Sequence, residues 1–398
     1  MSSRSSSRLL LLVTVLLVAA NLRSVITVVG PLVERIGVDT GFNPLALGAL
    51  GSIPIFVFGF VSPFVHLMGT RLGLDRTIFA ALLVLTGGTL LRSYGEALMP
   101  TWISLYAGTA LLAAAIGVGN VLVPAVVKRD FPDKVAVMTG LYTSVMIALA
   151  ALASGVAVPV ADTLGWENTL AAPAALTLLA IAAWLMRRSR RSDRHQHTSV
   201  PLPGGHSVPN SVWSQPLAWQ VTAFFGLQST VFFIMLTWFP AIQTSHGIPE
   251  ASAGMWLGIF QAVGVVANLL IGPVLQRMPD QRLFSAVITA FMLTAILGIM
   301  FAPSLMPVWA VCLGLSTGTS LLLALTLVSV RAGSIEKVGK LSGMAQGVGY
   351  LLAACGPLAA GALYQAADSW TPVLWCVVGI VLLLGTSGHL ASRNRQLR

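Results

Sequence analysis

Long apolar stretches, separated by short polar segments, follow one another along the whole chain. A helix needs about 20 apolar residues to cross a bilayer. The pattern therefore predicts an all-α membrane protein with twelve transmembrane helices. Their expected ranges are 9–34, 44–68, 74–94, 99–126, 134–159, 167–187, 215–243, 250–275, 282–302, 304–330, 338–366 and 371–391.

The first of these ranges has an alternative interpretation. Arg4 and Arg8 precede an apolar run, and the "VAAN" that ends it resembles a signal-peptide cleavage site. Cleavage would leave eleven helices and disturb the internal symmetry described next. We therefore interpret the segment as a transmembrane helix and keep the secretory signal as the alternative.

Two halves of the chain share short motifs in the same order. The pairs lie about half a chain length apart, and they are Ser62-Pro63 with Gly272-Pro273, Thr139-Gly140 with Ser342-Gly343, and Gly165-Trp166 with Ser369-Trp370. This order indicates an internal duplication. We expect two pseudo-symmetric six-helix halves, at 1–187 and 214–398.

A polar segment separates the two predicted halves. It is basic and then rich in Pro, Gly and Ser, which is typical of a linker, and we place it at 188–213. It contains His195, His197 and His206, but no cluster of Cys or carboxylate ligands accompanies them, so we expect no metal site.

Composition and charge support a membrane protein. The chain is 56% hydrophobic and 9% charged, whereas soluble domains have about 25% charged residues. The net charge of +10 does not indicate nucleic-acid binding, because the basic residues lie between apolar runs. All 23 Lys and Arg residues except Arg23, Arg35 and Arg92 fall on the side of the N-terminus. The positive-inside rule then predicts that both termini are cytoplasmic.

Three stretches of the chain are similar to a known family. They are "NLRSVITVVGPL" in the first helix, "GVGNVLVPAVVKRDFPDKVAVMTGLY" at 117–142 and "LSGMAQGVGYLLAACGPLAAGAL" at 341–363. In them the chain resembles the cyanate permease and 2-nitroimidazole transporter branch of the major facilitator superfamily. The resemblance implies the major facilitator fold in a bacterial cytoplasmic (inner) membrane. It also implies a carrier of small anions or small heterocycles, and many such relatives use protons as the coupling ion.

One segment departs from the pattern of that superfamily. The loop between its second and third helices usually carries an Asp, and here His66 stands about at that position, followed by Gly69, Arg71 and Arg76. We therefore do not assign the usual gating salt bridge to this loop.

Arg23 is the most informative residue of the first helix. It lies about 14 residues into the range 9–34, roughly 20 Å along the axis, which is well inside the membrane. A charge at this depth costs about 2.5 to over 10 kcal/mol without a partner or water. Every Asp and Glu falls in a loop or near a helix end. Our hypothesis is that the substrate is the missing counter-ion; the alternative is an Arg bonded to backbone carbonyls and side-chain amides at a helix joint.

Other polar residues in the predicted helices are further candidates. Neutral amides, hydroxyls and phenols can bind an anion or a heterocycle by hydrogen bonds, and interhelical packing is the alternative role for each. The predicted substrate-binding set is Arg23, Thr27, Asn120, Tyr142, Gln228, Gln261, Asn268, Gln346 and Tyr350. Lys128, Arg129 and Asp130 form a charged turn that could act as a gate, or simply be a solvated loop.

The function that these features favour is secondary active transport. We expect alternating access for a small anionic or planar heterocyclic solute, such as a cyanate-like anion or a nitroimidazole-like compound. We also expect no cofactor and no catalytic residues, because nothing in the sequence resembles a nucleophile triad, a P-loop or a metal cluster. We expect the protein to be a monomer. The alternatives are an efflux carrier for neutral compounds, in which Arg23 is structural, and a membrane enzyme or sensor.

Overall fold

The computed structural model describes residues 2–131, 135–191, 212–278, 280–333 and 335–397. Most of the predicted linker, with its three histidines, lies outside these residues, and so does the side chain of His66. The α-helices are α1 (Ser2–Thr27), α2 (Val29–Thr40), α3 (Pro44–Leu72), α4 (Leu74–Tyr94), α5 (Thr101–Asp130), α6 (Val135–Leu164), α7 (Trp166–Ala171), α8 (Pro173–Arg191), α9 (Pro216–Ser245), α10 (Glu250–Arg277), α11 (Arg282–Phe301), α12 (Met306–Arg331), α13 (Ile335–Ala367) and α14 (Trp370–Ala391). Short 3-10 helices η1 (Gly95–Ala97), η3 (Val212–Ser214) and η4 (Pro303–Leu305) lie between them.

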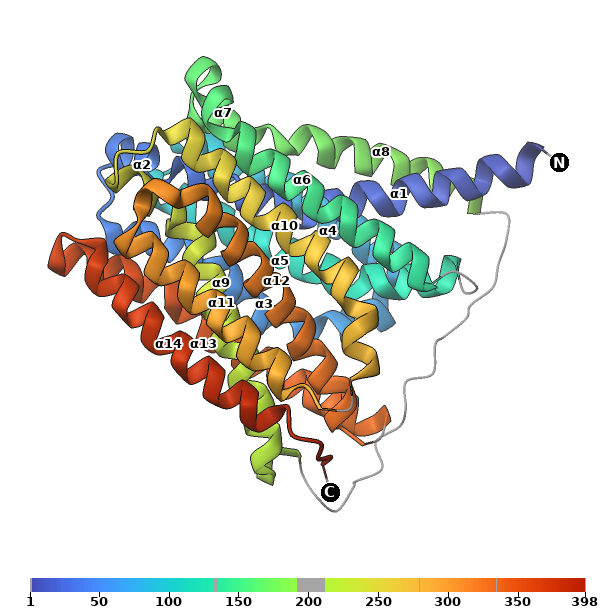
Figure 1. The fold of residues 1–398 in the computed structure, drawn as a ribbon. Helices are drawn as coiled ribbons and strands as arrows, with labels where there is room; N and C mark the ends of the chain where they lie inside the picture. Colours follow the sequence, from blue (N-terminus) through green and yellow to red (C-terminus); the bar gives the residue numbers. More distant parts are fainter. Residues whose placement is uncertain (1, 132–134, 192–211, 279, 334, 398) are drawn as a thin grey trace.

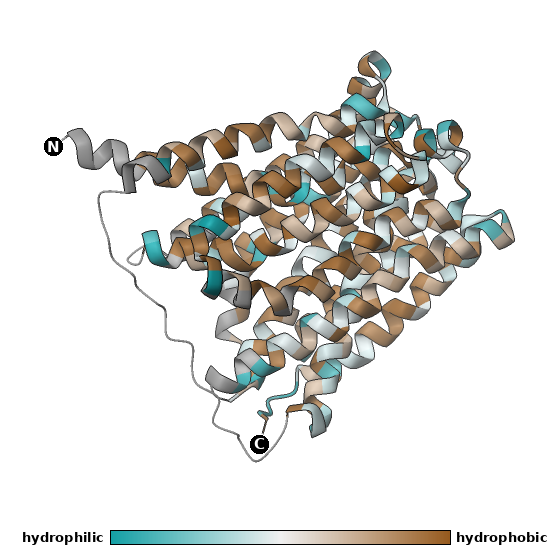
Figure 2. Ribbon diagram, turned by 180° about the vertical axis from the view of Figure 1, so that it is seen from behind, coloured by the Kyte–Doolittle hydropathy of each residue, from teal (hydrophilic) through white to brown (hydrophobic). Residues whose placement is uncertain are grey.

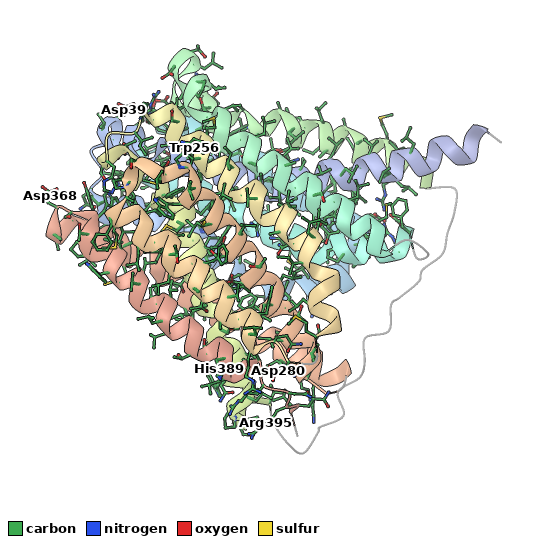
Figure 3. All side chains as sticks on the ribbon, viewed as in Figure 1. Asp39, Trp256, Asp280, Asp368, His389 and Arg395 are labelled. Carbon is green, nitrogen blue, oxygen red and sulfur yellow. The ribbon has the colours of Figure 1, made fainter. Side chains whose placement is uncertain are left out.

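The predicted helical membrane architecture is confirmed. Within the described residues, twelve segments are long and apolar enough to cross a membrane. Apolar residues cover the lengths of the helices, and hydrophilic residues gather mostly at their ends (Figure 2). Asp39 and Asp368 lie at one end of the bundle, and Asp280 and Arg395 lie at the other (Figure 3).

The first predicted helix is divided in two, contrary to the prediction of one helix over 9–34. α1 ends at Thr27 and α2 begins at Val29. Pro31 has no N–H to bond the Thr27 carbonyl four residues back, and its ring crowds that carbonyl. The hydroxyl of Ser154 in α6 donates to the Thr27 oxygen instead, at 3.2 Å. The predicted sixth helix, 167–187, is divided in the same way, into α7 and α8, and Pro173 begins α8.

Within the described residues, each half of the chain contains six membrane-spanning segments, and they pack side by side in one bundle (Figure 1). In the first half, α1 packs on α5, α6 and α8, and α4 packs on α3, α5 and α8. In the second half, α9 packs on α12, α13 and α14, and α10 packs on α12. The halves meet where α3 packs on α13, α6 on α10, and α2 on α9.

Glycines permit the close approach of the two halves. A Cβ on Gly48 of α3 would lie 2.5 Å from the Pro357 carbonyl oxygen, and a Cβ on Gly258 of α10 would lie 2.7 Å from that of Ala151. The end of the bundle that carries both termini is called the terminal end below, and the opposite end, with α2 and the start of α10, is called the distal end (Figure 1).

Candidate functional site

Arg23 lies on α1 at the junction of the two halves. Its guanidinium carbon is 5.5 Å from the centre of the Phe232 ring of α9, a cation–π distance. The side chain is half-buried, and within the described chain it makes no hydrogen bond or ion pair. The predicted absence of a carboxylate partner therefore holds for the described residues. The alternative role, an Arg bonded to backbone carbonyls and amides, finds no such bond here.

Tyr350 of α13 completes an aromatic wall beside Arg23. It is close enough for the phenol and the guanidinium to interact electrostatically. Its ring meets the ring of Phe225 edge-on, with centroids 5.3 Å apart. The site thus combines one cation with the faces of aromatic rings from the second half, an arrangement that suits a planar, electron-rich solute.

A second pair of predicted residues is joined through α6. Thr27 lies one turn after Arg23, and its hydroxyl donates to the Ala150 carbonyl at 3.1 Å. The Ser154 hydroxyl donates to the Thr27 carbonyl, so its oxygen is left as an acceptor, and Gln261 Nε2 donates to it at 2.9 Å. These consecutive hydrogen bonds determine which way the Gln261 amide group points. Its Oε1 is consequently turned to the other side, where it is buried without a hydrogen bond.

The remaining predicted binding residues make no hydrogen bond to this group among the described contacts. Gln228 is buried and donates to the neighbouring Ser229 hydroxyl at 2.7 Å. Gln346 donates to Ser342 one turn earlier on α13. Asn268 is half-buried, with Oδ1 lacking a partner.

Two further candidates lie on helices of the first half. Asn120 of α5 is exposed. Tyr142 of α6 is buried and packs in an apolar cluster with Met138 and Met146. The described contacts therefore bring together Arg23 with Tyr350, and Thr27 with Gln261 through Ser154, but they connect neither pair with Asn120 or Tyr142.

An ion-pair network joins the halves at the distal end. Arg35 of α2 donates from Nε and Nη2 to both carboxylate oxygens of Glu250 in α10, at 2.6–2.9 Å, and from Nη2 to Asp162 at 2.7 Å. The hydrogen bond to Glu250 is the largest cause of a raised pKa for Arg35. These residues were not among the predicted site residues, because partners so far apart in the chain give no local signal.

Glu34 makes a further contact between the halves beside this network. Its Oε1 lies 2.8 Å from the Thr244 hydroxyl of α9. Burial of the carboxyl raises the pKa of Glu34, the Thr244 hydrogen bond lowers it, and the charge of Glu250 raises it further.

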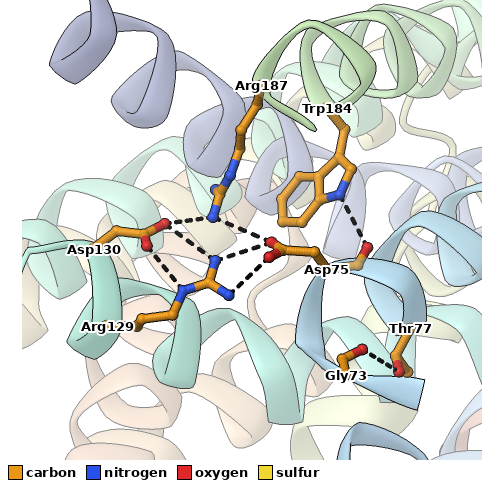
Figure 4. Close-up of polar contacts among 7 residues, drawn as sticks. All are labelled: Gly73, Asp75, Thr77, Arg129, Asp130, Trp184 and Arg187. Atoms are coloured by element: carbon orange, nitrogen blue, oxygen red, sulfur yellow. Dashed lines mark hydrogen bonds and ion pairs between the residues drawn. The ribbon is translucent and has the colours of Figure 1, made fainter. Parts of the chain in front are cut away.

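The charged residues of the predicted gate take part in a network inside the first half (Figure 4). Arg129 donates to both oxygens of Asp75 at 2.9 Å and to Asp130. Arg187 of α8 lies 2.5 Å from Asp130, and both side chains are 3% exposed. Burial lowers the pKa of Arg129, but the hydrogen bonds to Asp75 and Asp130 outweigh it and raise the pKa overall. The side chain of Lys128 lies outside the described ones.

Asp75 and Arg187 are the members of this network that the sequence analysis missed. Asp75 is the second residue of α4, and both of its carboxylate oxygens accept hydrogen bonds from Arg129. The sequence analysis assigned no gating salt bridge to this loop; in the structure Asp75, just after it, pairs with Arg129 and Arg187.

Three arginines near helix ends are buried. They are Arg92, Arg187 and Arg331. Arg331, at the end of α12, donates from Nε to the Ala391 carbonyl and from Nη2 to the Ser392 carbonyl and Gln281. Backbone carbonyls near a helix end thus stabilise a guanidinium, the arrangement that Arg23 lacks.

Comparisons with known proteins agree with this architecture. The family model of the Major Facilitator Superfamily matches residues 12–353 and 241–392. The chain is 36% identical to the 2-nitroimidazole transporter of Escherichia coli K12, over all of this chain and 99% of that one. It is 25% identical to the cyanate transport protein CynX of the same organism, over 94% of this chain and 96% of that one.

A solved structure shares the fold. A bacterial homolog of the human lysosomal transporter Spinster, in an inward-facing and unoccupied conformation, superposes with a TM-score of 0.74 at 13% identity, over 98% of this chain and 97% of that one. The sequence matches span nearly the whole chain, and the structural match covers both six-helix halves. This chain therefore belongs to the Major Facilitator Superfamily.

Proposed function

We propose that this transporter moves a small planar anion, or a planar heterocycle with a strongly polar oxygen, by alternating access, and that Arg23 binds it. The observation that carries the proposal is the guanidinium of Arg23. It is half-buried between the halves, lies over Phe232, and has no hydrogen bond or ion pair to a described residue. A buried cation is costly unless a partner neutralises it, and a bound anion is that partner.

Family membership supports the general part of the proposal, that the protein is a transporter. The chain is a multi-pass membrane transporter and not an enzyme. Two relatives are named for 2-nitroimidazole and cyanate, both of which are planar or linear and carry polar atoms that a guanidinium can bind. The aromatic rings of Phe232 and Tyr350 favour a ring-shaped solute over a linear one.

We infer that the terminal end faces the cytoplasm and that the protein lies in the bacterial inner membrane, because nearly all Lys and Arg residues fall on the terminal side. With that orientation, the halves meet at the outer end, through Arg35, Glu250, Glu34 and Thr244. We propose that a monomer suffices and that a gradient of substrate or protons drives transport.

Binding to purified Arg23 variants tests the proposal. Arg23→Gln is expected to lower the affinity for both cyanate and 2-nitroimidazole at least tenfold, because a charge-assisted hydrogen bond contributes about 1.5–3 kcal/mol. Arg23→Lys keeps the charge and is expected to retain part of the affinity, though not the planar, two-pronged contact. Unchanged affinity in Arg23→Gln would instead favour a carrier of neutral compounds with a structural Arg23.

A further inference from the structure

A small cavity lies between the halves on the distal side of Arg23. Its volume is about 20 Å³, which is room for one water-sized group. Ile26 and Gly30, three and seven residues after Arg23, line it from the same face of the chain. At 1.5 Å per residue, the cavity therefore lies roughly 5 to 10 Å beyond Arg23 along the helix axis. The cavity therefore lies between the level of Arg23 and the distal end of the bundle.

A buried arginine lines this cavity. Arg92 of α4 is 2% exposed. It donates from Nη1 to the Val25 carbonyl at 3.0 Å and from Nη2 to the Leu170 carbonyl at 3.1 Å. Its Nε is buried without a hydrogen bond. No carboxylate pairs with Arg92 in the described part of the chain, so its charge is balanced only by carbonyl dipoles.

Two threonines line the cavity together with Arg92. They are Thr109 of α5 and Thr237 of α9, which are 3% and 6% exposed. Neither hydroxyl forms a hydrogen bond with another described residue. Hydroxyls can donate to an anion without adding a fixed charge. Among the described residues, the cavity wall therefore contains one cation and two hydroxyl-bearing side chains, from both halves, and no acidic side chain.

The distal wall of the cavity is a contact between the halves. A Cβ on Gly30 would lie 2.5 Å from the Leu236 carbonyl oxygen, and one on Gly51 would lie 2.5 Å from the Thr237 hydroxyl oxygen. The halves touch here at glycines: Gly30 faces the backbone of Leu236, and Gly51 faces the side chain of Thr237. Opening of the distal end separates these pairs, which widens the cavity and exposes Arg92 to an incoming or outgoing solute.

We propose that Arg92, Thr109 and Thr237 form a second anion subsite, which the transported anion occupies between Arg23 and the distal opening. The subsite rests on the proposed function, since it serves the same solute. With two guanidinium groups along its path, the anion would move in short steps and would bind the second cation as it leaves the first. The competing role for Arg92 is a purely structural one, as a link between α1, α4 and α7 through their carbonyls.

Two measurements on the same variants separate these roles. Arg92→Gln and Thr237→Val are prepared together with the control Thr317→Val, a buried hydroxyl that bonds only within α12. The first measurement is equilibrium binding of 2-nitroimidazole to protein in detergent, and the second is its counterflow in proteoliposomes. We expect the binding affinity of both test variants to fall less than their transport, because the solute still binds at Arg23. We expect their counterflow to fall about tenfold, while Thr317→Val transports normally.

The opposite results overturn the subsite. If Thr237→Val transports normally, and Arg92→Gln loses thermal stability and binding in proportion to transport, Arg92 is only structural. Should Arg92→Gln fail to fold, Thr109→Val replaces it as the second test variant, with the same expectation. A failure of the proposed function looks different, because Arg23→Gln would then bind 2-nitroimidazole as well as the unchanged protein does.

Discussion

Arg35 and Glu250 join the two halves of the transporter through three hydrogen bonds of 2.6–2.9 Å at the distal end. The residues lie on α2 and α10, far apart in the chain, and each side chain is about a quarter exposed, at 29% and 26%. The pair can exist only while the halves are together at this end. It therefore favours the conformation in which the distal end is closed.

Replacement of Glu250 by Gln is expected to open the distal end more often. A partly exposed ion pair contributes about 1 kcal/mol or less, which is up to roughly fivefold in the equilibrium between closed and open states. The check is the alkylation rate of a Thr237→Cys reporter in protein without its native cysteines. Asp280→Asn is the control, because it removes an ion pair inside the second half. Equal alkylation rates in Glu250→Gln and the unchanged protein would contradict the expectation.

The distal closure is also expected to depend on pH through Glu34. Burial raises the pKa of its carboxyl above the ordinary 4.5, with Thr244, Glu250 and Tyr364 as the neighbouring groups. The closed state thus holds the proton more tightly than an open state with a hydrated carboxyl. Closure gains stability as the pH falls toward 4.5 and loses it as the pH rises through the raised pKa.

The same reporter at Thr237 measures this effect between pH 8 and pH 5. Alkylation, corrected for the pH dependence of the thiol with an exposed reference cysteine, is expected to slow on acidification. Glu34→Gln cannot titrate, so its corrected rate is expected to stay constant. A pH response of the same size in both proteins would assign the effect to another group.

Ser154 is expected to stabilise the break in the first helix. Its hydroxyl bonds the Thr27 carbonyl that Pro31 leaves without a helical donor. Ser154→Ala leaves this buried carbonyl unsatisfied, at a cost of about 1–3 kcal/mol in the free energy of unfolding. In a Pro31→Ala background the residue at 31 regains an N–H, and the same change is expected to cost less. A double-mutant cycle with no coupling would show that the two residues act independently.

Asp130 is expected to contribute far more to stability than Asp280. Asp130 and Arg187 are both 3% exposed, so Asp130→Asn leaves a buried guanidinium with a weaker partner. Breaking a buried pair costs about 3–5 kcal/mol. Asp280→Asn removes a pair that is 34–47% exposed, and we expect no measurable change. Denaturation in detergent measures the stability of both variants. Equal losses of stability would contradict the prediction that the buried pair contributes more.

Several features of the protein could be read from local sequence. Helix number and order follow from apolar length, because each segment must match the bilayer thickness independently of its neighbours. The lack of a carboxylate partner for Arg23 could be predicted from the positions of the Asp and Glu residues, since none of them lies at the same depth in the membrane. The helix break at Val28 was not predicted, although Pro31 indicates it. The reason is that the length of an apolar run does not show where the helix within it is interrupted.

The amino-acid sequence by itself determined the class of protein, the positions of its membrane helices and the presence of a cation at mid-membrane depth. Only the tertiary structure decided which of the buried or half-buried arginines have hydrogen-bond acceptors beside them. Arg92 and Arg331 donate to backbone carbonyls of other segments, whereas Arg23 lies over Phe232 and has no hydrogen bond to a described residue. The physical reason is that hydrogen bonds and ion pairs act over about 3 Å. Their partners come from distant parts of the chain, and only helix packing brings them within that distance.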